Sequence, residues 1–279
     1  MDTLRNKKGY NDKEAIEISY DIQAGSYIEN VKHNERLFKE YWDELGKVID
    51  RITSNEERVL DCGAGEMTTL CGLLEREIFR NCRVYAFDLS FSRIHTGIRY
   101  LKSKSIDGQK VFGFVADMMS LPFRKSSIEV VYTTHAIEPN RGRKREILRE
   151  IFRVASEKVI LFEPSYEENS KEGRERMDKL GYIRDLPEAI EKENGNLIKK
   201  IKIKNTLNEL NPTYAYYIEP PNGKSCVSKG NIISCPISKS LLKKKKGCYY
   251  SEESLIAYPI IWGVPLLREE DGIIATSAV

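Results

Sequence analysis

Histidine is scarce in this sequence, and its cysteines form no dense framework. The chain has three histidines and six cysteines in 279 residues. Three of the cysteines lie in the first third and three near the C-terminal end. A chain of this length buries a sufficient core without disulfide staples. We therefore expect the cysteines to stay reduced, as in cytosolic proteins.

Long apolar runs are also missing. The most apolar segment, residues 255–267, is interrupted by Pro259, Gly263 and Pro265. It is shorter than the roughly 20 residues that a membrane-spanning helix needs. The basic start, residues 1–9, is not followed by the apolar stretch of a signal peptide. We therefore expect a soluble, cytoplasmic protein with no membrane attachment.

Neither sign of charge is in large excess. The 45 Lys and Arg residues are nearly balanced by 42 Asp and Glu residues, and the formal net charge is +3. A dedicated nucleic-acid binder is usually more basic. The basic runs at residues 199–204 and 243–246 are typical of solvated faces. We therefore do not expect nucleic acid as the main partner.

Strand and helix patterns alternate through the middle of the chain. Helices are predicted at residues 91–102 and 143–154, and the extended pair 197–207 and 213–218 predicts a closing β-hairpin. Buried strands are predicted at residues 58–61, 83–88, 111–117, 128–133 and 158–162. Strands separated by helices indicate βαβ units, so we predict an α/β fold with a parallel, doubly wound sheet.

Three parts of the chain follow from this pattern. Residues 1–55 are predicted to form a helical cap, because the apolar stripe between residues 29 and 52 needs a partner surface. Residues 56–220 form the predicted central domain, with a polar arm at residues 165–195. Proline and glycine punctuation after residue 219 marks a boundary, so residues 221–279 are predicted to be a small module.

Acidic residues end three consecutive predicted strands: Asp61, Asp88 and Asp117. The carboxyl ends of parallel strands meet at one edge, where ligands bind. Gly63 and Gly65 follow the first strand and let a ligand approach the backbone closely. Asp88 comes roughly 20–25 residues after this turn, where an acid binds a ribose diol in nucleotide-binding folds.

The glycine motif of dinucleotide-binding folds is incomplete. Thr68 occupies its third glycine position, and the sequence has no phosphate-binding P-loop motif. The pattern therefore indicates a nucleoside-like ligand without a diphosphate, with Asp117 accepting from an exocyclic amine and Met118 packing on a flat ring. Each feature also has a structural interpretation, since such a turn can be merely tight and a strand-terminal acid can cap a helix.

Four segments together resemble the successive motifs of class I S-adenosylmethionine (SAM)-dependent methyltransferases of the small-molecule type: VLDCGAGEMT, VYAFDLS, VADMMSLPF and IEVVYTTHAIEP. The resemblance covers residues 58–218. It implies SAM as the cofactor and a Rossmann-like, seven-stranded, mostly parallel sheet with helices on both faces and a terminal β-hairpin. Residues 20–27 resemble the lid that covers the cofactor in small-molecule members.

The same resemblance assigns roles to individual residues. Asp61 and the glycine turn would line the methionine moiety, Asp88 would bind the ribose, and Asp117 would hold the adenine edge. Leu89 would lie against the adenine and Thr134 beside the sulfonium. The implied cofactor-binding residues are Tyr27, Asp61, Gly63, Ala64, Gly65, Asp88, Leu89, Asp117, Met118 and Thr134.

His135 follows the fourth predicted strand at the ligand edge. A sulfonium methyl is already activated, so the protein mainly aligns the reactants and excludes water. A hydroxyl acceptor needs a base, and His135, with an ordinary pKa near ~6.5, is the catalytic candidate with Glu138 in reserve. A lone histidine is, however, more often structural, and an amine acceptor needs only desolvation and orientation.

The acceptor is predicted from the arm. Its arginines and lysines suit an acidic small molecule, so we expect transfer to an oxygen or nitrogen of such a metabolite. A loose resemblance to methyltransferases of bacterial surface-polysaccharide pathways suggests a sugar. Two alternatives stay open: an rRNA or tRNA methyltransferase, and a non-catalytic adaptor with the same fold.

The C-terminal segments CPIS, CYYS and YPIIWGVP resemble a Trm112-like zinc ribbon. The second cysteine of each knuckle is replaced by Ser238 and Ser251. Hydroxyls are poor zinc ligands, and Cys226 adds only one further thiolate, so we expect no metal in this degenerate, β-rich module. It is predicted to pack on the domain, to form a homodimer contact or to cover the acceptor site.

Overall fold

The computed structural model describes residues 11, 13–51, 58–106, 111–221 and 230–276. A seven-stranded sheet with the order β3-β2-β1-β4-β5-β7-β6 forms its centre. The first five strands pair in parallel, and β7 joins β5 and β6 antiparallel. The strands are β1 (Arg58–Cys62), β2 (Arg83–Asp88), β3 (Val111–Val115), β4 (Ile128–Thr134), β5 (Ala155–Pro164), β6 (Asn196–Lys202) and β7 (Thr213–Glu219). The predicted fold class, including the terminal hairpin, is confirmed.

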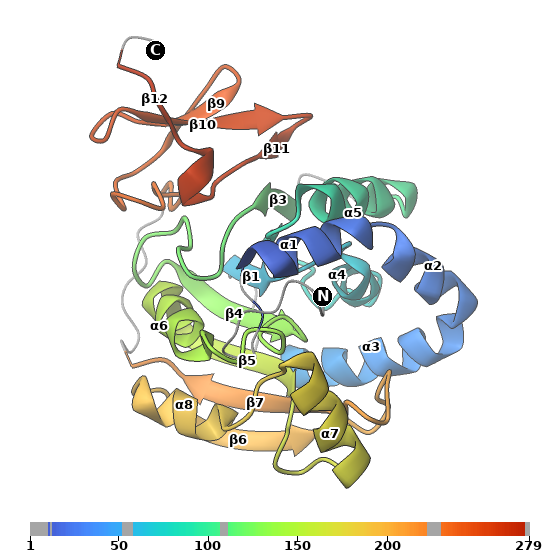
Figure 1. Cartoon of the computed structure of the whole chain (residues 1–279). Coiled ribbons are helices and arrows are strands. Elements are labelled where there is room, and N and C mark those ends of the chain that lie inside the picture. The colour runs from blue at the N-terminus through green and yellow to red at the C-terminus, as the bar shows by residue number, and fades with distance from the viewer. Residues whose placement is uncertain (1–10, 12, 52–57, 107–110, 222–229, 277–279) are drawn as a thin grey trace.

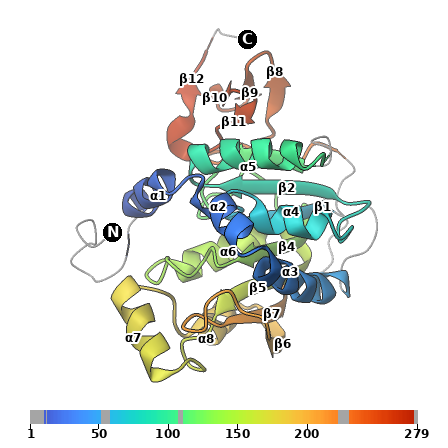
Figure 2. The same cartoon turned by 90° about the vertical axis from the view of Figure 1, so that its right-hand side faces the viewer.

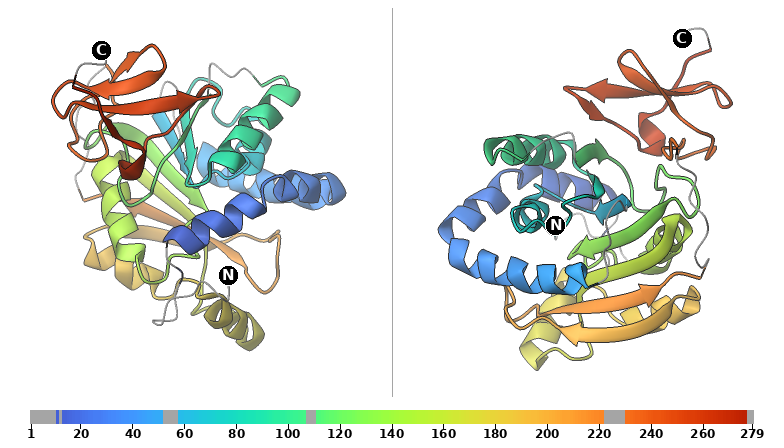
Figure 3. Two further views of the ribbon diagram at one scale, coloured as in Figure 1. Left: turned by 45° about the horizontal axis from the view of Figure 1, so that its top comes forward. Right: turned by 180° about the vertical axis from the view of Figure 1, so that it is seen from behind.

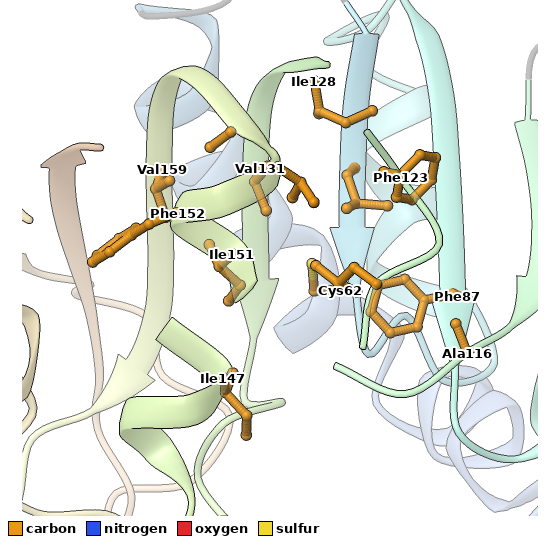
Figure 4. Packing of buried hydrophobic residues seen from close by; sticks show 14 of the residues in the cluster. Cys62, Phe87, Ala116, Phe123, Ile128, Val131, Ile147, Ile151, Phe152 and Val159 are labelled. Atoms are coloured by element: carbon orange, nitrogen blue, oxygen red, sulfur yellow. The ribbon is translucent and has the colours of Figure 1, made fainter. Parts of the chain in front are cut away.

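Helices cover both faces of the sheet (Figures 1 and 2). One face packs against α3 (Glu35–Asp50), α4 (Thr68–Leu74) and α5 (Phe91–Ser103), and the other against α6 (Lys144–Val154) and α8 (Leu186–Lys192). Successive strand residues point to opposite faces, so in β4 Val130 joins the first core while Val131 joins the second. Figure 4 shows the second core, where Ile151 and Phe152 of α6 lie over Val131 and Val159.

Three helices precede the sheet: α1 (Lys13–Ile22), α2 (Ser26–His33) and α3. The sequence predicted one helix from about residue 29 to residue 52, but the structure divides it at Asn34, where the backbone leaves helical geometry. Residue 52 lies outside the described residues. The buried stripe of α3 packs closely, since a Cβ on Gly72 of α4 would lie 2.1 Å from the Trp42 ring.

A small antiparallel β module follows the central sheet. It consists of β8 (Lys243–Lys245), β9 (Cys248–Ser251), β10 (Ile256–Ile261), β11 (Val264–Pro265), β12 (Ile273–Ile274) and the short 3-10 helix η1 (Glu269–Asp271). The module lies beside β3 at the edge of the central sheet (Figure 1). There the Leu267 amide donates to the Val115 carbonyl at 2.8 Å.

Between the other consecutive parallel strands the connecting segment forms a helix, but after β3 the module packs in that place. Residues 116–127 connect β3 to β4, and all of them are described, yet they form no helix. Instead, Phe123 pairs with Ile233, and Tyr249 packs edge-on against Phe112 with ring centroids 6.1 Å apart. The module and the sheet therefore share one hydrophobic core.

Polar hydrogen bonds surround Cys235 where the resemblance would place a metal. Its thiol accepts from the Ser238 amide at 3.4 Å and lies 3.2 Å from the Tyr258 hydroxyl. The hydroxyls of Ser238, Ser240 and Ser251 form a chain with steps of 2.7 and 2.6 Å. In the described part of the chain, no three His, Cys, Asp or Glu side chains could share a metal ion; Cys226 lies outside that part.

One further helix completes the description. Helix α7 (Lys171–Leu180) precedes α8 in the polar arm. None of the helices within the described ranges combines the length and the apolar character that crossing a membrane requires.

Candidate functional site

A cavity of about 130 Å³ lies at the carboxyl ends of β1 to β4, beneath α1 and α2. It gathers predicted residues from five separate parts of the chain. The predicted residues that line it are Tyr27, Gly63, Asp88, Leu89, Asp117, Met118, Thr134, His135 and Glu138. Asp61, Ala64 and Gly65 are not among its lining residues.

Asp88 ends β2 and is 7% exposed. Its two carboxylate oxygens accept from the amides of Gly65 and Ser90, each at 3.0 Å. The acid does not itself cap α5, because the Ser90 hydroxyl does so by accepting from the Arg93 amide at 3.1 Å. Asp88 thus ties the turn after β1 to the start of α5 and still faces the cavity.

Asp117 follows β3 and pairs with Lys13 of α1 at 2.8 Å. The same ammonium lies 2.7 Å from Glu270 of the C-terminal module. Burial disfavours the charged form of Lys13, but the two carboxylates outweigh this and hold its pKa above the ordinary value. A second ion pair joins Glu17 of α1 to Arg268 at 2.5 Å, so two ion pairs connect the module to α1. Figure 3 shows the module near α1.

Helix α2 is docked through its N-terminus. The carboxylate of Glu66, in the turn after β1, accepts from the amides of Gly25 at 2.9 Å and Ile28 at 3.0 Å. A negative charge at a helix N-terminus is favourable because the amides there have no helical partners. The lid predicted at residues 20–27 therefore meets the turn that carries Gly63 and Gly65.

The left-handed backbone of this turn favours its two glycines, and the chain's own side chains occupy the space next to them. Both have a left-handed backbone, with φ of +73° at Gly63 and +54° at Gly65. A Cβ on Gly63 would lie 2.5 Å from the Ala136 Cβ, and one on Gly65 would lie 2.4 Å from Nη2 of Arg93. The close approach that the sequence predicted for a ligand is made here by Ala136 and Arg93.

His135 stands at the other end of the cavity with both ring nitrogens engaged. Its Nδ1 lies 2.7 Å from Glu138, and its Nε2 lies 2.7 Å from the Thr213 hydroxyl. Asn211 donates to the same Glu138 oxygen at 2.8 Å. Burial disfavours the charged ring, but the carboxylates of Glu138 and Glu163 outweigh it and raise the pKa of His135 above its ordinary value. The neighbouring carboxylates therefore favour the protonated ring more than water does around a free histidine.

Glu163 fixes the turn that carries His135. This fully buried carboxylate accepts from the amides of Ala136, Ile137 and Glu138 at 3.0 to 3.1 Å. His135 itself has φ of +54°, a strained conformation for a residue with a side chain. Strain of this kind persists only where surrounding contacts determine it, and Glu163 supplies such contacts.

Unsatisfied polar atoms border the cavity. The Thr134 hydroxyl and Nε of Arg93 are buried, and neither has a hydrogen-bond partner among the described residues. Asp61 lies behind the cavity and is 3% exposed. Burial raises its pKa to about 7, and the negative charge of Asp88 acts in the same direction. The cavity thus combines buried carboxylates with polar atoms that have no partner among the described residues, a lining that suits a polar ligand.

The sequence did not single out Arg93, which lines the cavity, or Asn211 and Thr213, which contact Glu138 and His135. Arg93 lies in the first turn of α5, in a position that reads as an ordinary charged helix residue. Thr213 is the first residue of β7, and Asn211 lies two residues before it. Because β7 runs antiparallel to β5, its first residue lies opposite Pro164 at the carboxyl end of β5. The predicted hairpin was the available signal for these two.

Comparison with known proteins agrees with this geometry. Residues 59–158 match the family described as "Methyltransferase domain", which spans β1 to the middle of β5. A search of functionally curated proteins finds none that matches this sequence.

Solved structures share the fold at low sequence identity. A complex between the Haloferax volcanii Trm112 methyltransferase activator and a putative methyltransferase matches with a TM-score of 0.57, 16% identity and coverage of 72% of this chain and 97% of that one. A SAM-dependent methyltransferase from Aquifex aeolicus matches with a TM-score of 0.51 and 17% identity, and the match covers 70% of this chain and 97% of that one. A putative sarcosine dimethylglycine methyltransferase from Galdieria sulphuraria matches with a TM-score of 0.50 and 9% identity, and the match covers 67% of this chain and 86% of that one.

Proposed function

We propose that the chain is a SAM-dependent methyltransferase, because residues 59–158 match a methyltransferase domain, and that it methylates an oxygen or nitrogen of a small acidic metabolite. SAM supplies a methyl group on a positively charged sulfur, which needs no further activation. The chain's own residues have to bind the cofactor, orient the acceptor, exclude water and, for a hydroxyl acceptor, take a proton.

Two acids that line the cavity, Asp88 and Asp117, and the buried Asp61, which does not line it, suit the cofactor. We assign the ribose hydroxyls to Asp88, the adenine amine to Asp117 and the methionine ammonium to Asp61. Asp88 and Asp117 already accept protein hydrogen bonds. Each carboxylate oxygen has two acceptor sites, so capacity remains for a ligand.

The lid has to move for the cofactor to bind. The cavity of about 130 Å³ is below the roughly 300–1,000 Å³ of typical ligand pockets. Helices α1 and α2 are held over it by ion pairs and by the Glu66 contacts. The ion-pairing side chains are only 14–32% exposed, so opening the lid costs more than the roughly 0–1 kcal/mol of an exposed pair. Contacts with the bound cofactor would have to offset that cost.

The proposal of an acidic acceptor is based on Arg176 of α7. Its Nη1 is buried and has no hydrogen-bond partner among the described residues. Its guanidinium lies 5.5 Å from the Tyr182 ring centroid, and its positive charge acts on His135. A buried donor without a partner is costly, and a carboxylate or phosphate of the acceptor would satisfy it in bidentate geometry.

His135 and Glu138 are the proposed proton acceptors for a hydroxyl substrate. Glu138 accepts from Nδ1–H, which leaves Nε2 of the neutral ring as the acceptor. In the described contacts Nε2 faces the Thr213 hydroxyl, so a substrate hydroxyl would take the place of that group. Asn211 holds Glu138 in position.

The test combines a binding and an activity measurement. We expect S-adenosylhomocysteine (SAH) to raise the melting temperature of the wild-type protein. We also expect one member of a panel of uronic acids and hydroxy or amino carboxylates to be methylated. His135→Gln should lower kcat by roughly 10²–10⁴ for a hydroxyl acceptor while leaving SAH affinity unchanged. No SAH binding would refute the proposal, and methylation of RNA alone would favour the RNA alternative.

The pH dependence of SAH affinity should report on Asp61, whose pKa burial raises to about 7. Pairing with the methionine ammonium requires the ionised carboxylate, so binding releases a proton below pH 7. SAH affinity should therefore rise with pH up to neutrality and level off above it, with binding about tenfold weaker at pH 6 than at pH 8. Isothermal titration calorimetry across this range measures the effect.

The matched variants assign that dependence to one residue. Asp61→Asn should bind SAH weakly and with little dependence on pH. His135→Gln should keep the wild-type profile, because its ring lies at the acceptor end. A flat wild-type profile would contradict the assignment of Asp61 to the ammonium.

A further inference from the structure

Arg93 is a buried cation in the wall of the cofactor cavity. It lies in the first turn of α5 and is 7% exposed. The rings of Tyr20 and Tyr27, both from the lid, lie over its guanidinium with centroid distances of 4.8 and 4.5 Å. Cation–π contacts of this kind hold a guanidinium in place but satisfy none of its N–H donors by themselves.

The charge of Arg93 is incompletely compensated. The nearest carboxylate oxygen belongs to Asp88 and lies 4.0 Å from Nη1, beyond hydrogen-bond distance. That carboxylate already accepts from the amides of Gly65 and Ser90. Nε of Arg93 is buried with no partner among the described residues. A guanidinium has five N–H donors, and leaving even one of them unpaired in a buried site is costly.

The guanidinium rests directly on the glycine turn. A Cβ on Gly65 would lie 2.4 Å from Nη2 and 2.8 Å from Cζ of Arg93, so only glycine permits this approach. Resemblance to the methyltransferases assigns this turn to the methionine moiety. The buried cation therefore lies beside the part of the cavity where the amino-acid end of the cofactor is expected.

We propose that Arg93 binds the α-carboxylate of the methionine moiety of SAM and SAH. The inference rests on the proposed function and adds a ligand-binding residue to it. A carboxylate is the group that matches a guanidinium in bidentate geometry. It would supply the partners that Asp88 does not, while Tyr20 and Tyr27 keep the side chain over the turn. Closure of the lid would then be coupled to the amino-acid end of the cofactor.

The opposite role for Arg93 is a plug that fills the ribose space and has to leave before the cofactor binds. The two roles predict opposite changes in SAH affinity when Arg93 is replaced. A carboxylate-binding arginine makes SAH binding weaker when it is removed, whereas a plug makes SAH binding tighter.

The experiment compares two ligands that differ in the amino-acid group. SAH carries it, and 5′-methylthioadenosine has the same adenosine and thioether without it. Calorimetric titration of Arg93→Gln should show SAH binding weakened by roughly 10- to 100-fold, since one charge-assisted pair is lost. Affinity for 5′-methylthioadenosine should stay within about twofold of wild type. Arg93→Lys keeps the positive charge but lacks the planar pair of N–H donors, so it should give an intermediate loss of affinity for SAH alone.

The matched control is Arg99→Gln, an exposed arginine of the same helix, which should leave both affinities unchanged. Tighter SAH binding in Arg93→Gln, or equal losses for the two ligands, would overturn the inference in favour of a plug or a structural role. If Arg93→Gln does not fold, the Arg93→Lys comparison decides by the same criterion. A wild-type protein that binds neither ligand would refute the proposed function itself, whereas unchanged SAH affinity in a folded Arg93→Gln would refute only this inference.

Discussion

Replacing Asp88 by Asn should weaken SAH binding by at least about 100-fold. Two hydrogen bonds from ribose hydroxyls to a carboxylate contribute roughly 1.5–3 kcal/mol each, and 1.4 kcal/mol corresponds to a tenfold change in affinity. The amide of Asn retains one acceptor oxygen, while Asp88 uses both of its oxygens on the amides of Gly65 and Ser90. Calorimetric titration with SAH measures the loss.

Two controls separate ligand contact from structure. Glu77→Gln removes an acid whose side chain is 67% exposed and pairs only loosely with Arg80 at 3.5 Å, so SAH affinity should not change. Ser90→Ala removes the cap of α5 and should cost about 1 kcal/mol of stability with a much smaller effect on affinity. Wild-type affinity in Asp88→Asn would show that the ribose is not bound there.

Deleting the C-terminal module, residues 222–279, should yield an insoluble or molten protein. The module covers the sheet face where residues 116–127 form no helix. Tyr249, Tyr258 and Leu267 of the module belong to the same buried cluster as Phe114 and Phe123. Their removal would expose a contiguous apolar surface, and large patches of this kind promote aggregation. Solubility and near-ultraviolet circular dichroism of the truncated chain measure the outcome.

If the truncated chain cannot be purified, a single substitution at the contact between the module and the sheet tests the same prediction. Leu267 is fully buried, and its amide donates to Val115 of the edge strand β3. Leu267→Ala should lower the free energy of unfolding by about 2–5 kcal/mol, measured by urea denaturation. Ile273→Ala, at a side chain that is 58% exposed, should change it by less than about 0.5 kcal/mol. A soluble, cooperatively folding truncated chain would contradict the prediction, because it would show that the central domain folds without the module.

Local sequence patterns determined the architecture of the central domain. The alternation of buried strands with amphipathic helices predicted the parallel sheet, because strand and helix periods depend on neighbouring residues. The acids Asp88 and Asp117 were predicted to meet at one edge because parallel strands share the direction of their carboxyl ends. Both line the observed cavity.

The tertiary structure decided which side chains complete the site. Whether Arg93 turns inward depends on Tyr20, Tyr27 and Gly65, which lie on other elements. The first residue of β7, Thr213, reaches His135 because the last strand pair is antiparallel.

Contacts between the two ends of the chain are likewise not predictable from local sequence patterns. Lys13 bridges Asp117 and Glu270, and no local pattern links residues so far apart in sequence. Periodicity records which face of an element is buried, but not which element will cover it. The sequence by itself therefore determined the sheet and its acidic edge, whereas the lid, the buried arginine and the module that replaces a helix were decided only by long-range packing.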